Sequence, residues 1–481
     1  MKGRGASRGN NPDSKWNHIN QLAKEKCIGV LAIQEAHLTQ EHVDDLHKLF
    51  GKHLQIHFSQ GQNVNAHGVA IVLNRKITNI HGVQQVDIIP GRAMLLSLPW
   101  HSNLTLTILN VYAPNAHNEN QQFWETLELK WVNMNLPPPD IMLGDFNLVE
   151  DAIDHLPSHT DQFSAVNALD NFRSFLQLKD GWRTTWPTKR AFSFLQTSTG
   201  VQSHIDCIYA SNDIISSATD WNIEHTAVIT DHKMVSLNVT DPKTPFIGRG
   251  RWTMPLFLLK NEALMTEIHD LGLKFGDALS NVRERSTTSN PQILFKSFKD
   301  DAIKLIRTKA KAAVPKMEKK IQQLENNAQS LRDDPNLESE DKRPLGLIEE
   351  RIAALEAQRH RNACTATAAH DRLEGETISK YWSQVNKSQR PRDVIYALEK
   401  PGNGPTTYVN RSNHMAELAC NYHHDLLSDG LNTPPEEWAH ITAEVLSSIH
   451  PDSQLKNMPK AKLTKRLTRE EVLLSLQASS N

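Results

Sequence analysis

Four short segments in the first half of the chain combine acidic, amide and imidazole side chains in patterns suited to chemistry on phosphate esters. They are Gln34-Glu35, Gly144-Asp145-Phe146-Asn147, Ser203-His204-Ile205-Asp206 and Thr230-Asp231-His232. Each lies at or beside a short apolar run that is typical of a strand. Because α/β folds place their chemistry at strand ends and in the following loops, we expect the four segments to meet at one site.

Hydrolysis of a phosphodiester requires a cation site and an activated water. A hard divalent cation prefers oxygen ligands, for which Glu35 and Asp231 are suited. Asp145 can orient the attacking water, and the amide of Asn147 can hold phosphate oxygens. Taken alone, each of these residues also has a structural explanation, since Glu35 could be a solvated loop residue and Asp145 with Asn147 could form an Asx-type turn.

Asp206 lies inside an otherwise apolar strand, and a buried carboxylate needs a partner. We pair it with the imidazole of His232, because such a pair fixes the tautomer of the ring and favours its protonated form beside a phosphate. We therefore predict Asp145, Asn147, Asp206 and His232 as catalytic residues.

Short apolar runs and amphipathic helices alternate up to about residue 240. Strands are expected at 28–33, 68–73, 93–98, 104–112, 141–143, 204–209 and 226–239, and helices around Trp16–Ala23, Val43–Phe50 and Phe123–Trp131. Such mixing predicts an α/β sandwich over residues 1–240.

The composition changes after residue 240. Residues 241–255 begin with a segment rich in Pro, Gly and basic residues, which predicts a linker. Residues 256–400 are expected to form an all-α, coiled-coil-like connector, in which apolar seams at Met317–Leu331 and Ile348–Leu355 predict an antiparallel hairpin. Residues 401–481 are expected to lead toward a further domain that this sequence does not contain.

At these motifs the chain resembles the endonuclease/exonuclease/phosphatase superfamily, which includes pancreatic deoxyribonuclease. A further matching motif is Asn110-Val111-Tyr112-Ala113-Pro114-Asn115. The resemblance implies a four-layer, deoxyribonuclease I-like sandwich with Mg²⁺ or Mn²⁺ as cofactor. It also implies that Tyr112 contacts the scissile phosphate, that Glu35 binds the metal, and that Asp231 lies beside it.

Within that superfamily the chain is similar to the endonucleases of LINE-type, non-LTR retrotransposons. Asp154-His155-Leu156-Pro157, Trp186-Pro187 and Gly248-Arg249-Gly250-Arg251-Trp252 carry this likeness. The resemblance implies nicking of DNA for target-primed retrotransposition, followed by a connector to a reverse transcriptase that is absent. The family's first strand, which ends in an Asn, is expected to be missing before Met1.

Two alternatives remain open at the level of sequence. The first is an inactive remnant of a retroelement that keeps the fold, which a missing first strand would favour. The second is a cellular phosphatase of the same superfamily. The lipid phosphatases of that group are expected to carry an Arg at the position of Val149 and a Trp-Cys-Asp-Arg element, whereas here Cys207 follows Asp206.

The formal net charge of −2 provides no general attraction to nucleic acid, so DNA binding would need a local basic patch. Lys189, Arg190, Arg249 and Arg251 are candidates for phosphate contacts, although for any single one of them a solvated surface charge is the more common explanation. DNA is the expected partner and RNA of the same element a second candidate, with no membrane partner. The protein is expected inside the cell, in the nucleus when it acts or in a cytoplasmic ribonucleoprotein. The sequence indicates no oligomeric state.

Overall fold

A computed structural model of the chain describes residues 15–61, 67–100, 104–226, 228, 230–240, 254, 258–259, 261–282, 290–312, 316–334, 342–374, 395–401, 407–428 and 434–448. It divides into two units, each considered separately. The first comprises Met1–Thr244 with Gly248–Val394, and the second comprises Pro245–Ile247 with Ile395–Asn481. Within the described residues, no helix is both long enough and apolar enough to cross a membrane.

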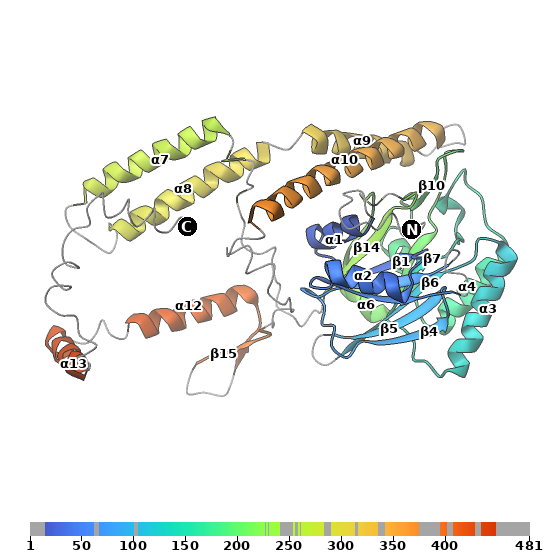
Figure 1. The fold of residues 1–481 in the computed structure, drawn as a ribbon, viewed down its shortest axis with the longest axis horizontal. Coiled ribbons are helices and arrows are strands. Elements are labelled where there is room, and N and C mark those ends of the chain that lie inside the picture. The colour runs from blue at the N-terminus through green and yellow to red at the C-terminus, as the bar shows by residue number, and fades with distance from the viewer. Residues whose placement is uncertain are drawn as a thin grey trace. The chain divides into compact units, whose positions relative to one another are not determined.

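Two β-sheets form the centre of the first unit (Figure 1). The larger sheet has six strands in the order β4 (Gln84–Ile89), β5 (Ala93–Pro99), β6 (Thr105–Tyr112), β7 (Ile141–Asp145), β12 (Asp206–Ala210) and β9 (Lys179–Asp180). Its strands are antiparallel except for β6 and β7, which run parallel. The smaller, antiparallel sheet has the order β1 (Val30–Gln34), β3 (Val69–Asn74) and β2 (Leu54–Ser59).

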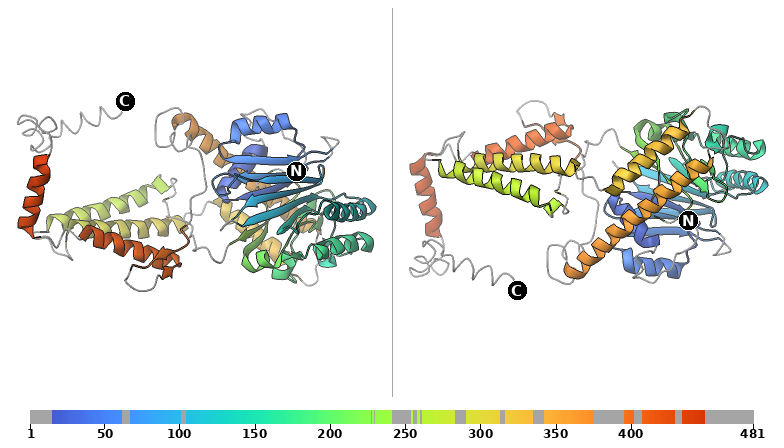
Figure 2. Two further views of the ribbon diagram at one scale, coloured as in Figure 1. Left: turned by 90° about the horizontal axis from the view of Figure 1, so that it is seen from below. Right: turned by 90° about the horizontal axis from the view of Figure 1, so that it is seen from above.

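The two sheets pack face to face, and helices cover their outer faces. All six residues of β3 are buried, as expected for a central strand between two layers. The helices α1 (Lys15–Glu25) and α2 (Gln40–Phe50) cover the smaller sheet, and α3 (His117–Asn133) and α4 (Phe163–Phe175) cover the larger one (Figure 2). The four-layer α/β sandwich predicted from the sequence is therefore confirmed.

Short elements complete the sandwich. A three-stranded sheet contains β10 (Phe194–Gln196), β11 (Val201–Ser203) and β8 (His155–Leu156), and β13 (Ala218–Glu224) pairs with β14 (Met234–Val239). Three short helices are η2 (Ala152–Asp154), α5 (Gly181–Thr185) and α6 (Asn212–Ser217). The predicted strand at residues 226–239 is wrong in its first half, because β14 begins only at Met234 and the described residues before it form bends and a single bridge at His232.

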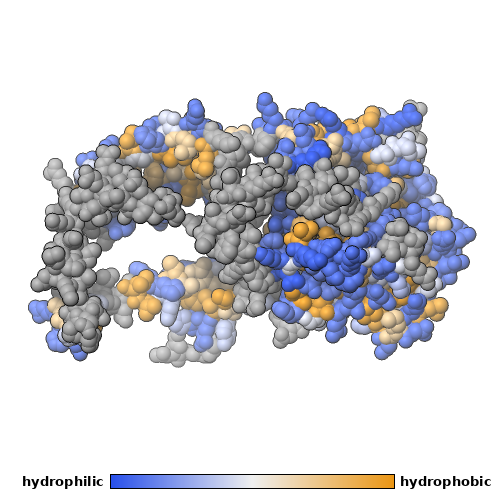
Figure 3. Space-filling view, viewed as in Figure 1, coloured by the Kyte–Doolittle hydropathy of each residue, from blue (hydrophilic) through white to orange (hydrophobic). Residues whose placement is uncertain are grey.

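The helices α7 (Glu262–Ser280), α8 (Pro291–Ala312), α9 (Lys316–Arg332) and α10 (Lys342–Glu374) follow in the first unit. Ile321 of α9 packs against Ile352 and Leu355 of α10, so the predicted seams do meet. Apolar side chains remain exposed on α7 and α8, including Leu273 and Phe295. Figure 3 shows a hydrophobic surface over these two helices. The second unit contains β15 (Leu398–Glu399), β16 (Tyr408–Val409), α12 (Ser412–Ser428) and α13 (Pro435–Ser448).

Gly144 in β7 is required by the close approach of β6. Its φ is 145°, and a Cβ atom there would lie 2.0 Å from the carbonyl oxygen of Val111. We predict that Gly144→Ala lowers the free energy of unfolding by more than about 3 kcal/mol, because backbone atoms of a central strand cannot move aside. Urea denaturation followed by near-UV circular dichroism measures this loss.

Gly272→Ala in α7 is the matched control, since nothing lies within 4 Å of its Cβ position. Alanine has the higher helix propensity, so this variant should keep the urea midpoint or raise it slightly. Equal destabilisation by the two variants would contradict the steric explanation.

Candidate active site

The central strands of the larger sheet bring three predicted site residues to one edge. Tyr112 ends β6 and is the register partner of Asp145, which ends the parallel strand β7. Asp206 begins the antiparallel strand β12 and is also a register partner of Asp145. The pairing of β6, β7 and β12 thus lines up a phenol and two carboxylates at neighbouring positions, although they are far apart in the sequence.

The predicted pair of Asp206 and His232 is present. The Nδ1 atom of His232 lies 2.8 Å from Oδ2 of Asp206. Burial lowers the pKa of the imidazole, but the charge of Asp206 and this hydrogen bond outweigh burial and raise it to about 9. For Asp206 burial acts in the opposite direction and raises the pKa of the carboxyl group. Attraction to His232 outweighs burial and leaves that pKa below its usual value. The pair is therefore an imidazolium and a carboxylate at neutral pH.

Asp145 is the carboxylate of this group whose ionised form is disfavoured. Only 6% of the residue is exposed, and burial together with the charge of Asp206 raises its pKa to about 7. The ligand atoms of Asp145, Asp206 and His232 all lie within 4.8 Å of one another. Close carboxylates of this kind repel each other when both are charged, so the group would be stabilised by a cation.

Phe146 anchors the turn that carries Asp145 and Asn147. Its side chain is fully buried and stacks on Trp124 of α3, with ring centroids 5.5 Å apart. Asn147 has a φ of 47°, and its backbone N–H donates to Oδ1 of Asp145 at 3.0 Å. The amide Nδ2 of Asn147 donates to the carbonyl oxygen of Ala113 at 2.9 Å, so this turn also binds to the segment after β6.

Glu35 reaches the group from the other sheet, at the end of β1. The Tyr112 hydroxyl donates to its Oε1 atom at 2.7 Å. Burial, together with this bond, raises the pKa of Tyr112 and keeps the phenol protonated. One residue earlier, the Gln34 side chain donates to the buried Asn110 at 2.7 Å, which joins the two sheets next to the site.

A cavity of about 130 Å³ opens at this edge. Its lining includes Glu35, Asp145, Asp206 and His232, together with apolar side chains of α1 and β1. Asp231 is not part of that lining, and its backbone oxygen accepts from the N–H of Leu195 at 3.1 Å. Four of the predicted residues therefore share one cavity, whereas a role for Asp231 as a metal ligand stays a prediction.

Ser193 is a residue of this site that the sequence did not single out. It is fully buried, and its hydroxyl accepts hydrogen bonds from the N–H groups of Ile205 and Asp206 at 3.1 and 3.0 Å. Ser193 therefore holds the start of β12, where Asp206 lies. Its position between two phenylalanines in Phe192-Ser193-Phe194 was the only available signal, because a lone polar residue in an apolar run needs a buried partner.

The four proposed DNA contacts are placed differently. The Lys189 ammonium lies over the rings of Trp182 and Trp186, 5.5 and 4.8 Å from their centroids. Arg190 donates to the carbonyl oxygen of Asp334, at the end of α9, at 3.3 Å. Arg249 and Arg251 lie outside the described residues.

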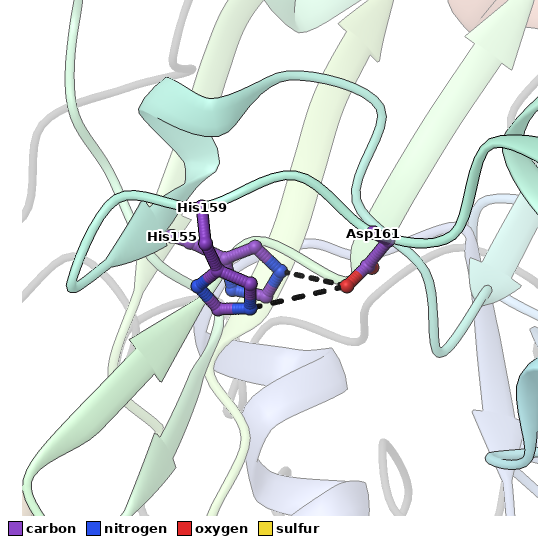
Figure 4. A group of neighbouring side chains, drawn as sticks. All are labelled: His155, His159 and Asp161. Atoms are coloured by element: carbon purple, nitrogen blue, oxygen red, sulfur yellow. Dashed lines mark hydrogen bonds and ion pairs between the residues drawn. The ribbon is translucent and has the colours of Figure 1, made fainter.

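A second group of potential metal ligands, His155, His159 and Asp161, lies beside β8 (Figure 4). The two Nε2 atoms are 3.3 and 4.0 Å from Oδ1 of Asp161. However, the rings are stacked, with centroids 3.8 Å apart and planes only 16° from parallel. Both Nε2 atoms lie near the same oxygen of Asp161, so in this structure the three side chains contact one another. The group cross-links the segment after β7, where Asp161 also accepts from the N–H of Val149.

Comparison with known proteins identifies relatives of the α/β part. Residues 8–232 match the Endonuclease/Exonuclease/phosphatase family. The chain is 32% identical over 188 residues to the "Transposon TX1 uncharacterized 149 kDa protein" of Xenopus laevis, a match that covers 38% of this chain and only 14% of that protein. The chain thus spans about a seventh of the length of this relative.

Solved structures of similar proteins include the endonuclease domain of TRAS1, a telomere-specific non-LTR retrotransposon. It shares 15% identity and a TM-score of 0.36, covering 48% of this chain and 95% of that domain. The AP endonuclease LMAP of Leishmania major shares 15% identity and a TM-score of 0.39, covering 47% of this chain and 82% of that one. Residues 8–232, somewhat less than half of the chain, are thus similar to the Endonuclease/Exonuclease/phosphatase family.

Proposed function

We propose that the α/β part of this chain is a divalent-metal-dependent endonuclease that nicks DNA during retrotransposition. The observation that carries the proposal is the convergence of Glu35, Asp145, Asp206 and His232 on one cavity. Hydrolysis of a phosphodiester needs a cation site, an acceptor for the proton of water and a cationic donor to the phosphate, and these side chains supply all three. The family match and the similarity to a transposon protein support the same class of reaction.

The residues present fit a hard cation such as Mg²⁺ or Mn²⁺. Glu35, Asp145 and Asp206 offer carboxylate oxygens, which such ions prefer. Burial and the charge of Asp206 together raise the pKa of Asp145, and a bound cation would stabilise its ionised form. When bound, the ion would neutralise charge developing on the phosphate and on the leaving oxygen.

His232 is the proposed donor to the phosphate. Its Nδ1 atom is occupied by Asp206, which leaves Nε2 to face the substrate as the proton-bearing nitrogen. Asp145 is the proposed acceptor of a proton from the attacking water. The Tyr112 hydroxyl donates its single proton to Glu35, so a contact from Tyr112 to the scissile phosphate would replace that hydrogen bond. Asn147 holds the turn beside Asp145.

The first prediction concerns activity. Asp145→Asn and His232→Ala should each lower the rate of nicking of supercoiled plasmid in Mg²⁺ by roughly 10²- to 10⁴-fold, because each removes a group needed for proton transfer or charge stabilisation. Asp87→Asn, on an exposed position of β4, is the matched control and should nick at the rate of the unaltered chain.

This assay also separates the alternative functions. No nicking above background by the unaltered chain would favour an inactive remnant of a retroelement. Release of inorganic phosphate from phosphomonoesters, without nicking, would favour a phosphatase of the same family.

The second prediction concerns pH. Asp145 must be ionised to accept a proton, so kcat/KM for nicking should fall as the pH drops through about 7, and a bound cation would move this limb to lower pH. His232 must be protonated, so activity should also fall as the pH rises through about 9. Asp206→Asn removes the charge that raises the pKa of His232, and the alkaline limb should move down by about 1 to 3 units. An unchanged alkaline limb in Asp206→Asn would contradict the assigned role of the pair.

The third prediction concerns metal and stability. The folded-state pKa of Asp145 is raised, so its contribution to stability is present below pH 4 and is lost as the pH rises through about 7. At pH 8 in EDTA, Asp145→Asn should therefore raise the melting temperature. Added Mg²⁺ should raise the melting temperature of the unaltered chain by more than that of the variant. Differential scanning fluorimetry measures both shifts, and equal Mg²⁺ shifts would argue against a cation site at Asp145.

A further inference from the structure

A buried carboxylate outside the active site joins the helical hairpin α9–α10 to the α/β part. Glu349 of α10 is fully buried, and its side chain binds three basic groups. Lys233 Nζ lies 2.9 Å from Oε1, Arg332 of α9 binds the same oxygen, and Nε2 of His225 binds Oε2. Two of these partners come from the α/β part and one from the hairpin itself.

Glu349 is ionised in this position. Burial raises its pKa, but attraction to Lys233, the hydrogen bond from His225 and the charge of Arg332 outweigh burial and leave the pKa well below its usual value. A buried charge without a partner costs several kcal/mol, so the buried ammonium of Lys233 depends on Glu349. The hairpin and the segment that carries Lys233 are therefore coupled by charge.

Lys233 directly follows His232 in the sequence. Between β13 and β14 the structure describes residues 225–226, 228 and 230–233, and a β-bridge joins His232 of this segment to Phe194 of β10. The β10 region holds it from one side, where the N–H of Lys233 donates to the oxygen of Ser193 at 2.6 Å. Glu349 binds both ends of this segment from the other side, through His225 and Lys233.

Apolar contacts and a ring contact also join the hairpin to the α/β part near this ion cluster. Leu345 and Ala328 pack with Leu156 and Phe192 of the α/β part. Further along α10, the ring of His360 stacks on that of His18 in α1, with centroids 4.3 Å apart. The hairpin thus contacts the α/β part at several separate places, and Figure 2 shows α10 lying across it.

We propose that Glu349 is a positioning residue for His232. Through Glu349, the α9–α10 hairpin contributes to the activity of the nuclease and does not serve only as a spacer after it. Glu349 holds the segment from His225 to Lys233 so that the His232 ring meets Asp206 and faces the cavity. The expected effect on kcat rests on the proposed nuclease function. The expected effect on the structure of the segment rests on geometry alone.

The test uses the full chain with Glu349→Gln, which keeps the shape of the side chain and removes its charge. Hydrogen–deuterium exchange, read by mass spectrometry, should be faster in peptides covering residues 225–239 and unchanged in those covering β3 and β6. For nicking, kcat should fall by about 10- to 100-fold with KM nearly unchanged, because a displaced His232 impairs the reaction and leaves DNA binding intact.

Glu350→Gln is the matched control, since Glu350 is the next residue of α10 and is exposed. It should leave both exchange and kcat unchanged. Should Glu349→Gln fail to fold, Lys233→Met serves in its place, because it removes the contact between Lys233 and Glu349 while Arg332 still balances the charge of Glu349. The expected result for Lys233→Met is the same faster exchange and lower kcat.

Wild-type exchange and kcat in the folded variants would overturn the proposal, as would a change in KM alone. An unaltered chain that does not nick DNA would count against the proposed function, whereas the exchange measurement would still decide whether Glu349 holds this segment.

Discussion

The arrangement of the site depends on one balance of charge, in which the single imidazolium of His232 lies beside the carboxylates of Asp145 and Asp206. The β7–β12 register fixes that balance, because it places the two carboxylates opposite each other. A slip by one residue would turn Asp206 to the other face of the sheet. Buried apolar neighbours prevent such a slip, so the apolar core protects the electrostatics of the site.

The second requirement is that two separate sheets meet at this edge. Glu35 belongs to the smaller sheet, and only contacts across the sandwich bring it near Tyr112 and Asp145. The hydrogen bond between Gln34 and the fully buried Asn110 serves this purpose one residue away. An unpaired amide at Asn110 would be costly to bury, so the polar pair favours one alignment of the sheets.

The sandwich and most of the cavity could be predicted from sequence, because strands and the polar groups at their ends are local features. Asp145 follows an apolar run and Asp206 interrupts one. A polar residue at such a position can be recognised in a single sequence. The apolar run at 227–229 predicts a strand over residues 226–233. Among the described residues of this segment, however, the only β pairing is the single bridge between His232 and Phe194. Glu349 gave no signal at all, because a glutamate in a charged helix looks solvated until a second domain surface covers it.

An ion cluster such as the one around Glu349 determines where the hairpin binds more than it adds to the stability of the fold. Removing charges from water offsets much of the attraction between them, so a buried ion cluster is weak evidence of added stability. The apolar contact around Leu345 is also small, since four buried side chains form its core. What the cluster contributes is selectivity, because any other seating of the hairpin would leave a buried charge without a partner. Such selectivity suits the proposed role of the hairpin, which is to hold His232 in one place.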